Sequence, residues 1–221
     1  MEEFLGILFC GGKGERLGEL TRYISKSFIP VFDKPVFKFG LEQLEKSELV
    51  NEIIILTNRY NDKLLSGEGY KTIVQDDNIV NDMFSGWNYV KEITGTKKHG
   101  VLIPSDNIRE TEIDFLIGKF IESGSEFLFS LKNINDANKL SQMGTFDTAY
   151  NKYSYKKAVS SMGVIAPYII SNKTDLKRRF NIFESDNSEY LIYEGIWFDL
   201  GDFESIVNAC KWRQKTIADK F

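Results

Sequence analysis

The first half of the chain alternates short apolar runs with stretches whose apolar residues recur every three or four positions. The short runs, rich in β-branched and aromatic residues, predict buried strands, and the periodic stretches predict helices. The predicted strands are residues 4–10, 52–57, 70–75, 100–104 and 126–131. The predicted helices are residues 37–48, 81–93 and 112–123. Strands and helices in this order favour parallel crossover connections, with helices on both faces of a sheet.

The second half of the chain has a different pattern. Residues 142–154 and 162–170 both predict strands with no helix between them, so we expect some antiparallel pairing. A short strand at residues 195–200 precedes Asp202, which suits the N-cap of a closing helix. No repeat or linker divides the chain, which predicts a single domain over residues 1–221. The expected fold is α/β: a Rossmann-like mixed, mainly parallel sheet with helices on both faces and a small β-rich insertion.

Composition and charge argue against several classes of function. The 221 residues carry a net charge of -4 and have a pI near 5.3, whereas binding to nucleic acid needs a concentrated basic face. No apolar run approaches the length of a membrane span, and the Met-Glu-Glu start lacks the basic region of a secretory signal. Cys10 and Cys210 stand far apart and fit small buried residues of a reducing compartment. We therefore expect a cytoplasmic protein that binds neither nucleic acid nor membrane.

The single histidine, His99, excludes metal motifs that need two or more histidines. It lies in the polar stretch of residues 96–100 and is predicted to be a solvated loop residue. Any chemistry must therefore come from carboxylates, lysines, arginines and backbone amides.

A glycine-rich segment follows the first predicted strand directly. Residues 11–18 read GGKGERLG, and glycines there let backbone N–H groups approach an anion while lysine and arginine add positive charge. In an open parallel sheet, the loops at the carboxyl ends of the strands form the ligand crevice. Neither a Walker A loop nor the dinucleotide-binding glycine pattern is present. Taken alone, the segment is also compatible with a tight turn that carries solvated charges.

The residues that follow extend this segment into a long compound motif. The sequence reads GGxGxRL at residues 11–17, LT at 20–21 and SKxxxPVxxKPV at 25–36. This set resembles the signature of the sugar-1-phosphate nucleotidyltransferases, the glucose-1-phosphate thymidylyltransferase-like members above all. The resemblance implies that Arg16 contacts the departing pyrophosphate and that Lys26 contacts the phosphates near the reacting phosphorus. The residues implied to wrap the triphosphate are Gly11, Gly12, Lys13 and Gly14.

Two aspartates carry the expected metal chemistry. Asp106 lies in a segment that resembles the family's GDN motif, with Ser105 in place of the glycine, and Asp199 lies in a segment that resembles W-x-D-T-G, with Leu200 in place of the threonine. By this resemblance both bind Mg²⁺, which neutralises charge that develops during nucleotidyl transfer. Each aspartate by itself would fit a strand-end turn or a helix cap.

The base and acceptor sides match the family less fully. Gln75 resembles the glutamine that reads the edge of the base, whereas Ile79 replaces a family glycine that meets the base. Lys152 stands where the family's E-K-P motif grips the acceptor phosphate, although the two neighbouring positions differ, and Gly163 resembles the glycine of a T-G-L-Y strand beside the sugar. An ordinary strand pair is the alternative for this region. The segment from residue 171 to residue 194 is short, so an allosteric and oligomer-forming part of the family would be missing.

These residues predict a nucleotidyltransferase that moves a nucleoside monophosphate from a nucleoside triphosphate to a phosphorylated small molecule, by the resemblance a sugar-1-phosphate, with release of pyrophosphate. Mg²⁺ is the expected cofactor. Residues of about 1–108 would bind the nucleotide and residues of about 109–221 the acceptor. Two alternatives stay open: the same chemistry on a non-sugar phosphate such as a phosphorylated amino alcohol, and a catalytically silent nucleotide-binding regulatory subunit. A homo-oligomer is compatible with each.

Overall fold

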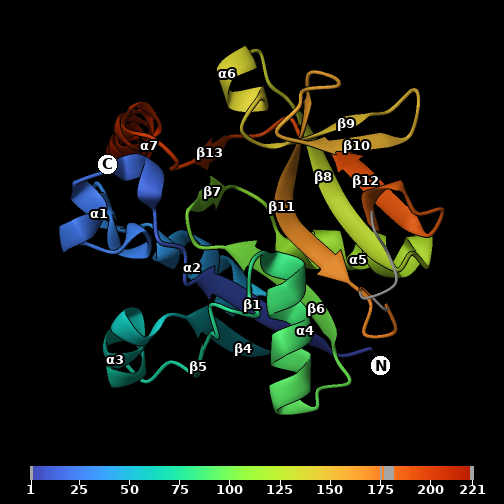
Figure 1. The fold of residues 1–221 in the computed structure, drawn as a ribbon, viewed down its shortest axis with the longest axis horizontal. Helices are drawn as coiled ribbons and strands as arrows, with labels where there is room; N and C mark the ends of the chain where they lie inside the picture. The colour runs from blue at the N-terminus through green and yellow to red at the C-terminus, as the bar shows by residue number, and fades with distance from the viewer. Residues whose placement is uncertain (1, 175, 177–181, 220–221) are drawn as a thin grey trace.

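The computed structural model describes residues 2–174, 176 and 182–219 and has a nine-stranded mixed sheet at its centre (Figure 1). The strands run in the order β10-β9-β11-β6-β1-β4-β5, and β8 pairs with β11 and β12. The first half of the chain forms a parallel group of strands: β1 (Phe4–Cys10), β4 (Val50–Thr57), β5 (Thr72–Val74) and β6 (His99–Pro104). The carboxyl ends of these strands therefore meet at one edge of the sheet.

The other strands of the sheet come from the second half of the chain and pair mostly antiparallel. β11 runs antiparallel to β6, β8 and β9, whereas β12 runs parallel to β8. Their bounds are β8 (Phe127–Asn133), β9 (Gly144–Asp147), β10 (Lys152–Tyr155), β11 (Met162–Ile170) and β12 (Ser188–Ile192). This arrangement confirms the α/β fold with a mixed sheet that the sequence predicted.

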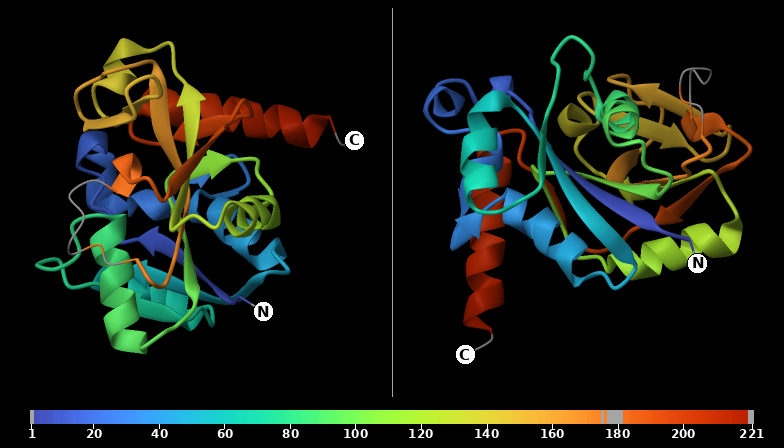
Figure 2. Two further views of the ribbon diagram at one scale, coloured as in Figure 1. Left: turned by 90° about the vertical axis from the view of Figure 1, so that its right-hand side faces the viewer. Right: turned by 90° about the horizontal axis from the view of Figure 1, so that it is seen from below.

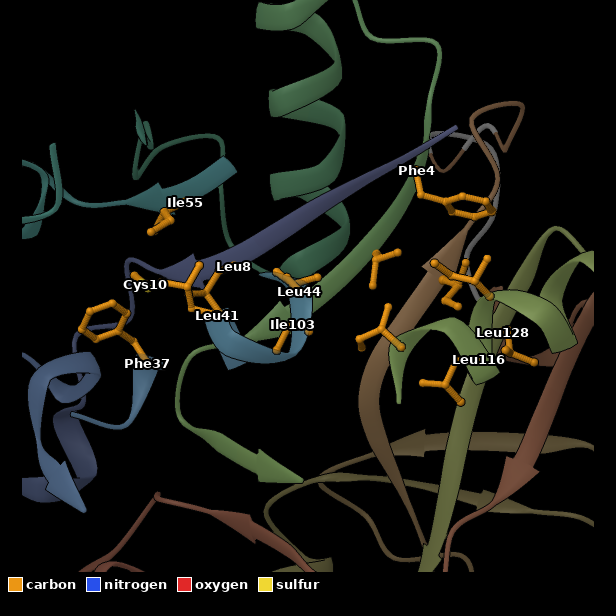
Figure 3. Close-up of a cluster of buried hydrophobic side chains, with 14 of the residues drawn as sticks. Phe4, Leu8, Cys10, Phe37, Leu41, Leu44, Ile55, Ile103, Leu116 and Leu128 are labelled. Atoms are coloured by element: carbon orange, nitrogen blue, oxygen red, sulfur yellow. The ribbon is translucent and has the colours of Figure 1, made fainter. Parts of the chain in front are cut away.

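Helices pack on both faces of the sheet, as the alternation of apolar side chains within each strand requires. In β1, Leu8 and Cys10 belong to one buried cluster, and Leu5 and Ile7 belong to another on the opposite face. Figure 3 shows the first cluster in close-up. Three helices contribute side chains to it: α2 (Phe37–Lys46), α3 (Arg59–Gly67) and α5 (Ile113–Ser123). The opposite cluster includes α4 (Met83–Thr94), which buries Trp87 completely.

Two small sheets and several shorter elements surround this core. The strand pairs are β7 (Asn107–Arg109) with β13 (Trp197–Asp199) and β2 (Pro30–Val31) with β3 (Lys34–Pro35). The shorter helices are α1 (Leu20–Tyr23), α6 (Ala137–Leu140) and the 3-10 helices η1 (Glu15–Leu17), η2 (Lys26–Phe28) and η4 (Ile182–Glu184). Within the described residues, no helix is both long enough and apolar enough to cross a bilayer.

The last helix, α7 (Phe203–Ala218), begins where the sequence predicted. The Asp202 side chain accepts a hydrogen bond from the Ser205 backbone N–H at 2.7 Å and so caps the helix. The C-terminal end of α7 projects away from the sheet (Figure 2). Near the start of α7, Ala209 packs into a small buried cluster with Leu200 and Val31. The helix therefore ties the segment after β13 to the segment around β2.

Some elements differ from the prediction. Residues 142–154 do not form one strand, because β9 and β10 make a hairpin whose turn includes Asn151 at φ +49°. Helix α3 was not predicted, since its sequence offers few apolar positions from which to read a helical period. The signal it does carry is the N-cap Asn58, whose side chain accepts a hydrogen bond from the Asn61 N–H at 2.9 Å.

The prediction for His99 was wrong, and of the two cysteines predicted to be buried, Cys10 is buried and Cys210 is only partly buried. Cys10 is buried, and burial raises the pKa of its thiol to about 12. His99 is the first residue of β6, and its ring centroid lies 5.2 Å from that of Phe4 and 5.5 Å from that of Phe120. Burial lowers the pKa of its imidazole, and Nδ1 accepts a hydrogen bond from the Asn172 N–H at 3.3 Å. These partners lie far from His99 in sequence, so the polar residues around it concealed its packing.

The stability of the protein is expected to fall as the pH drops below about 6.5, because the unfolded chain then takes up a proton at His99 that the folded chain resists. The stabilisation that comes from a neutral His99 is fully present above the pKa of His99 in the unfolded chain. It is lost as the pH falls from that pKa to the lower pKa of His99 in the folded protein. His99→Asn keeps an acceptor for Asn172 and removes the titration. Melting temperatures of both proteins at about pH 8 and about pH 5 check this. The variant should lose less stability than the wild type, and an equal loss would contradict the role of His99.

Candidate active site

The loop after β1 presents its backbone to a cleft at the carboxyl edge of the parallel strands. Gly14 has φ +67°, and a Cβ there would lie 2.7 Å from Thr21 Cγ2, so both the turn and the packing need glycine. The Thr21 hydroxyl donates to the Gly14 carbonyl oxygen at 3.1 Å. Lys13 is exposed, with its Nζ 3.8 Å from Asp77 Oδ2. Residues of the loop line neighbouring cavities of about 380, 430 and 820 Å³. The predicted phosphate-binding loop therefore borders open space.

Lys26 and Asp106 form an ion pair in this cleft. Lys26 is the first residue of η2 and is 8% exposed, and its Nζ donates to Oδ2 of Asp106, which follows β6. Hydrogen bonds hold the two segments together, because the hydroxyls of Ser27 and Ser105 lie 2.8 Å apart and Ser27 also donates to the Cys10 carbonyl oxygen. A lysine that is held this way supplies a positive charge that solvent screens only weakly.

Asp199 reaches the same place through the pairing of β13 with β7. Asp199 is the register partner of Asn107, and the Leu200 N–H donates to the Asp106 carbonyl oxygen at 2.9 Å. The Trp197 indole N–H donates to Asn107 Oδ1 at 3.0 Å and fixes the pairing further. The tertiary structure thus brings together two carboxylates that are far apart in the sequence.

The electrostatics of this carboxylate pair favour a bound cation. Burial raises the pKa of the Asp199 carboxyl, and the negative charge of Asp106 raises it further, whereas Lys26 and Arg16 act in the opposite direction. No group of three or more histidine, cysteine, aspartate or glutamate side chains that could hold a metal occurs in the part of the chain that the structure describes. Two carboxylates fit Mg²⁺, which takes few protein ligands and completes its shell with water and substrate phosphates.

Arg16 reaches from the glycine loop to the second half of the chain. Its Nη1 donates to Gln142 Oε1 at 2.9 Å, and its Nη2 lies 3.9 Å from Asp199 Oδ2. A Cβ at Gly201 would lie 2.7 Å from Nη2, so the guanidinium packs directly on the backbone that follows β13. Arg16 and Lys26 therefore bring positive charge to the carboxylate pair from two different segments.

Gln75 lies at the border of the cavity of about 380 Å³. Its amide packs on Gly11, where a Cβ would be 1.9 Å from Gln75 Oε1, and its Nε2 donates to Asp77 Oδ1 at 2.8 Å. The lining of the cavity combines apolar residues with polar ones such as Lys26 and Asp106. Its apolar lining, called its apolar side below, consists of Phe9, Val80, Met83 and Pro104. Such a cavity can hold a flat ring whose polar edge faces Gln75.

The two residues predicted to bind the acceptor do not line the cavities that surround the glycine loop. Lys152 is exposed on β10, opposite Asp147. Gly163 lies in β11 under apolar side chains, since a Cβ there would be 2.5 Å from Ile134 Cδ1 and 2.8 Å from Met143 Cε. Packing alone accounts for this glycine.

Lys156 is a residue at the site that the sequence did not single out. It lines the cavity of about 430 Å³ together with Arg16, Lys26 and Asp106. Its backbone has φ +56°, a left-handed conformation that is strained for lysine and that often marks a functional site. Its N–H donates to the Met143 carbonyl oxygen at 3.0 Å, which holds the turn. The only signal in the sequence was a pair of lysines after a predicted strand, which is also typical of a solvated turn.

The sequence model of the nucleotidyl transferase family matches residues 5–147, more than half of the chain. The chain belongs to the nucleotidyl transferase family. The matched region includes the glycine loop, Lys26, Gln75 and Asp106, whereas Asp199 and Lys156 lie beyond it. In this nucleotidyl transferase, the contacts of Arg16 with Asp199 and of Asp106 with Leu200 therefore join the matched region, residues 5–147, to residues beyond it.

Comparisons with individual proteins agree with this assignment. Over 219 residues, the chain is 23% identical to a bifunctional sugar-1-phosphate nucleotidylyltransferase/acetyltransferase of Sulfurisphaera tokodaii, covering 93% of this chain and 54% of that protein. It is 36% identical over 67 residues to a glucose-1-phosphate thymidylyltransferase of Neisseria meningitidis, covering 29% of this chain and 23% of that protein. The nucleotidyl transferase thus spans about half the length of the first relative and aligns with less than a quarter of the second.

A solved structure supports the fold over almost the whole chain. The crystal structure of a putative glucose-1-phosphate thymidylyltransferase from Bacillus anthracis, in complex with a sucrose, superposes with a TM-score of 0.78 at 20% identity. The superposition covers 95% of this chain and 94% of that chain. The strands and helices of this nucleotidyl transferase therefore follow a known architecture, including the second half where the sequence pattern is weak.

Proposed function

We propose that this protein transfers a nucleoside monophosphate from a nucleoside triphosphate to a sugar-1-phosphate and releases pyrophosphate. The observation that carries the proposal is the cluster of Lys26, Asp106, Asp199 and Arg16 beside the glycine loop. Two carboxylates and two cations at the carboxyl edge of parallel strands suit the charges of a triphosphate and a metal ion. The names of the relatives support a sugar-1-phosphate as the acceptor. A cytoplasmic location belongs to the same proposal.

The nucleoside triphosphate would occupy the cavity of about 380 Å³ and the adjoining loop. Its base would lie against the apolar side with its polar edge toward Gln75. The backbone N–H groups of the glycine loop, together with Lys13 and Arg16, would bind the β- and γ-phosphates. Lys26 would contact the α-phosphate, which puts a buried positive charge next to the phosphorus that reacts.

Asp106 and Asp199 would hold Mg²⁺, and the bound ion would supply positive charge to the phosphate oxygens. The acceptor is already an anion, so its phosphate oxygen needs no general base before it attacks. That oxygen forms a bond to the α-phosphorus while the bond from the α-phosphorus to the bridging oxygen breaks, and pyrophosphate leaves with the electron pair. The protein contributes position and charge: Lys26 at the α-phosphate and Arg16 at the leaving pyrophosphate.

A grid of nucleoside triphosphates against phosphorylated acceptors tests the proposal. Pyrophosphate release would be measured with Mg²⁺ for sugar-1-phosphates and for phosphorylated amino alcohols. We expect release with at least one sugar-1-phosphate. Release with amino alcohol phosphates alone would keep the chemistry and change the acceptor class. Thermal stabilisation by nucleotide without release from any pair would favour a silent binding subunit.

Lys156 is expected to contact the acceptor phosphate, because it lines the same cavity as Lys26 and Asp106. Lys156→Ala should lower kcat/KM for the acceptor roughly tenfold to a hundredfold, the size of a charge-assisted hydrogen bond, with a smaller effect on the KM for the nucleotide. Lys152→Ala is the matched variant, since the sequence pattern favours that lysine and the geometry favours Lys156. A larger loss in Lys152→Ala than in Lys156→Ala would return the role to Lys152.

A further inference from the structure

Two of the polar side chains that line the cavity of about 380 Å³ bind each other. Gln75 Nε2 donates to Asp77 Oδ1 at 2.8 Å, and both residues line this cavity. Gln75 Oε1 packs on Gly11 so closely that a Cβ at that position would be 1.9 Å away. The Gln75 amide is therefore held on two sides, by the carboxylate and by the glycine backbone.

The orientation of the amide follows from the chemistry of its partner. An ionised carboxylate accepts hydrogen bonds and donates none, so the amide must turn its NH₂ group toward Asp77. Because the amide oxygen packs on Gly11, this leaves the carboxylate of Asp77 and one amide N–H of Gln75 for a ligand. Lys13 Nζ lies 3.8 Å from Asp77 Oδ2 and partly balances the negative charge of the carboxylate. It does not take up the hydrogen-bonding groups of the Gln75 amide. The Gln75–Asp77 pair thus offers a ligand a carboxylate acceptor beside one amide donor.

We propose that this pair selects nucleoside triphosphates whose base carries an exocyclic amino group beside an unprotonated ring nitrogen, so that cytosine or adenine is preferred to uracil, thymine or hypoxanthine. The inference rests on the proposed function, since it assigns the nucleotide of the same site. An exocyclic amino group donates to a carboxylate, and the neighbouring ring nitrogen accepts from an amide N–H. A keto oxygen in the same position would face the Asp77 carboxylate with no proton between them, which costs binding energy.

The neighbouring aspartate offers a control with the same charge and a different position. Asp76 lines the cavity of about 820 Å³ and not the one of about 380 Å³. Its Oδ1 accepts from the Asn78 N–H at 2.9 Å, a bond that asparagine can also accept. Asp76→Asn and Asp77→Asn therefore remove the same charge from the same loop, but only the second replaces an acceptor at the base edge with a possible donor.

Calorimetric titration with matched nucleotide pairs tests the inference. CTP and UTP differ in the amino and keto groups of the pyrimidine, and ATP and ITP differ in the same way in the purine. In the pair that binds more tightly, we expect the nucleotide with the amino group (CTP or ATP) to have a Kd roughly tenfold or more below that of the nucleotide with the keto group (UTP or ITP). Asp77→Asn should bring this ratio close to one, whereas Asp76→Asn should leave it as in the wild type.

The outcomes separate this inference from the proposed function. Equal or tighter binding of the keto member, or an unchanged ratio in Asp77→Asn, would overturn the selection by Asp77 even where pyrophosphate is released. A clear amino preference with no pyrophosphate release from any acceptor would support the inference and count against the proposed reaction. Failure of all four nucleotides to bind, with pyrophosphate release from another nucleoside triphosphate, would overturn the inference and keep the proposed function. Failure to bind together with no release across the whole grid would overturn both.

Discussion

Asp106→Asn is expected to fold like the wild type and to release pyrophosphate roughly a hundredfold to a thousandfold more slowly. Asp106 lies at the end of β6 and its side chain pairs with Lys26 and accepts from Asn107 Nδ2 at 3.0 Å. Asparagine has nearly the same shape and keeps one acceptor oxygen, which can serve one of these two donors. The Leu200 N–H still donates to the backbone carbonyl oxygen of residue 106, so the strand and the loop should remain in place. What it loses is the negative charge that would hold Mg²⁺ beside the α-phosphate.

The test is a steady-state rate over a titration of Mg²⁺, with melting temperature as the check on folding. Asp186→Asn is a suitable control. Asp186 is exposed, so this substitution removes the same charge from the surface of the protein. We expect Asp186→Asn to have the wild-type rate. A near-normal rate in Asp106→Asn at all Mg²⁺ concentrations would rule out a metal-binding role for this aspartate.

Lys26→Met is expected to lower kcat by a similar factor, roughly a hundredfold to a thousandfold, through a different cause. Methionine fills the space of the aliphatic part of this buried side chain but supplies no charge to the α-phosphate. The variant also leaves Asp106 without its cation, and Asp106 and Asp199 already raise the free energy of the metal-free protein by their mutual repulsion. We therefore expect a loss of about 1–3 kcal/mol of stability without Mg²⁺.

The double variant Lys26→Met/Asp106→Asn separates the two effects. Because it removes the cation and its partner together, it should recover most of the stability that Lys26→Met loses. Its activity should stay as low as that of the single variants, since neither charge is restored. Additive stability losses, measured by chemical denaturation, would show that the two side chains are not energetically coupled, and wild-type kcat in Lys26→Met would exclude its role at the reacting phosphorus.

The parallel half of the fold could be predicted from the sequence because its signals are local. Apolar runs such as Phe4–Cys10 and periodic stretches such as Phe37–Lys46 bury one face or one stripe against the sheet, and the order of the elements then fixes parallel crossovers. The β9–β10 hairpin was missed because its turn interrupts an otherwise continuous strand pattern. Strand β12 was missed because it is short and lies in a segment without a clear period.

The candidate site divides in the same way. Gly11, Gln75 and Asp106 lie at or just after the ends of β1, β5 and β6, so their place at one edge of the sheet follows from local strand signals. Their roles were predicted from the resemblance and stay predictions. Asp199 could be suspected only from its motif, and its place beside Asp106 depends on the pairing of β13 with β7. Lys156 had no usable signal, because its position depends on a left-handed turn and on the β9–β10 hairpin.

The sequence by itself determined the class of fold, the place of the glycine-rich loop after the first strand and the candidate charged residues, because periodicity, glycines and motif spacing are local properties of the chain. Only the tertiary structure decided which charges meet: Lys26 with Asp106, Arg16 with Asp199 and Gln142, and Lys156 on the same cavity. It also decided that His99 is packed between aromatic rings and that Gly163 is covered by apolar side chains. These contacts join residues far apart in the sequence, and their geometry follows from strand register and packing, which local patterns do not contain.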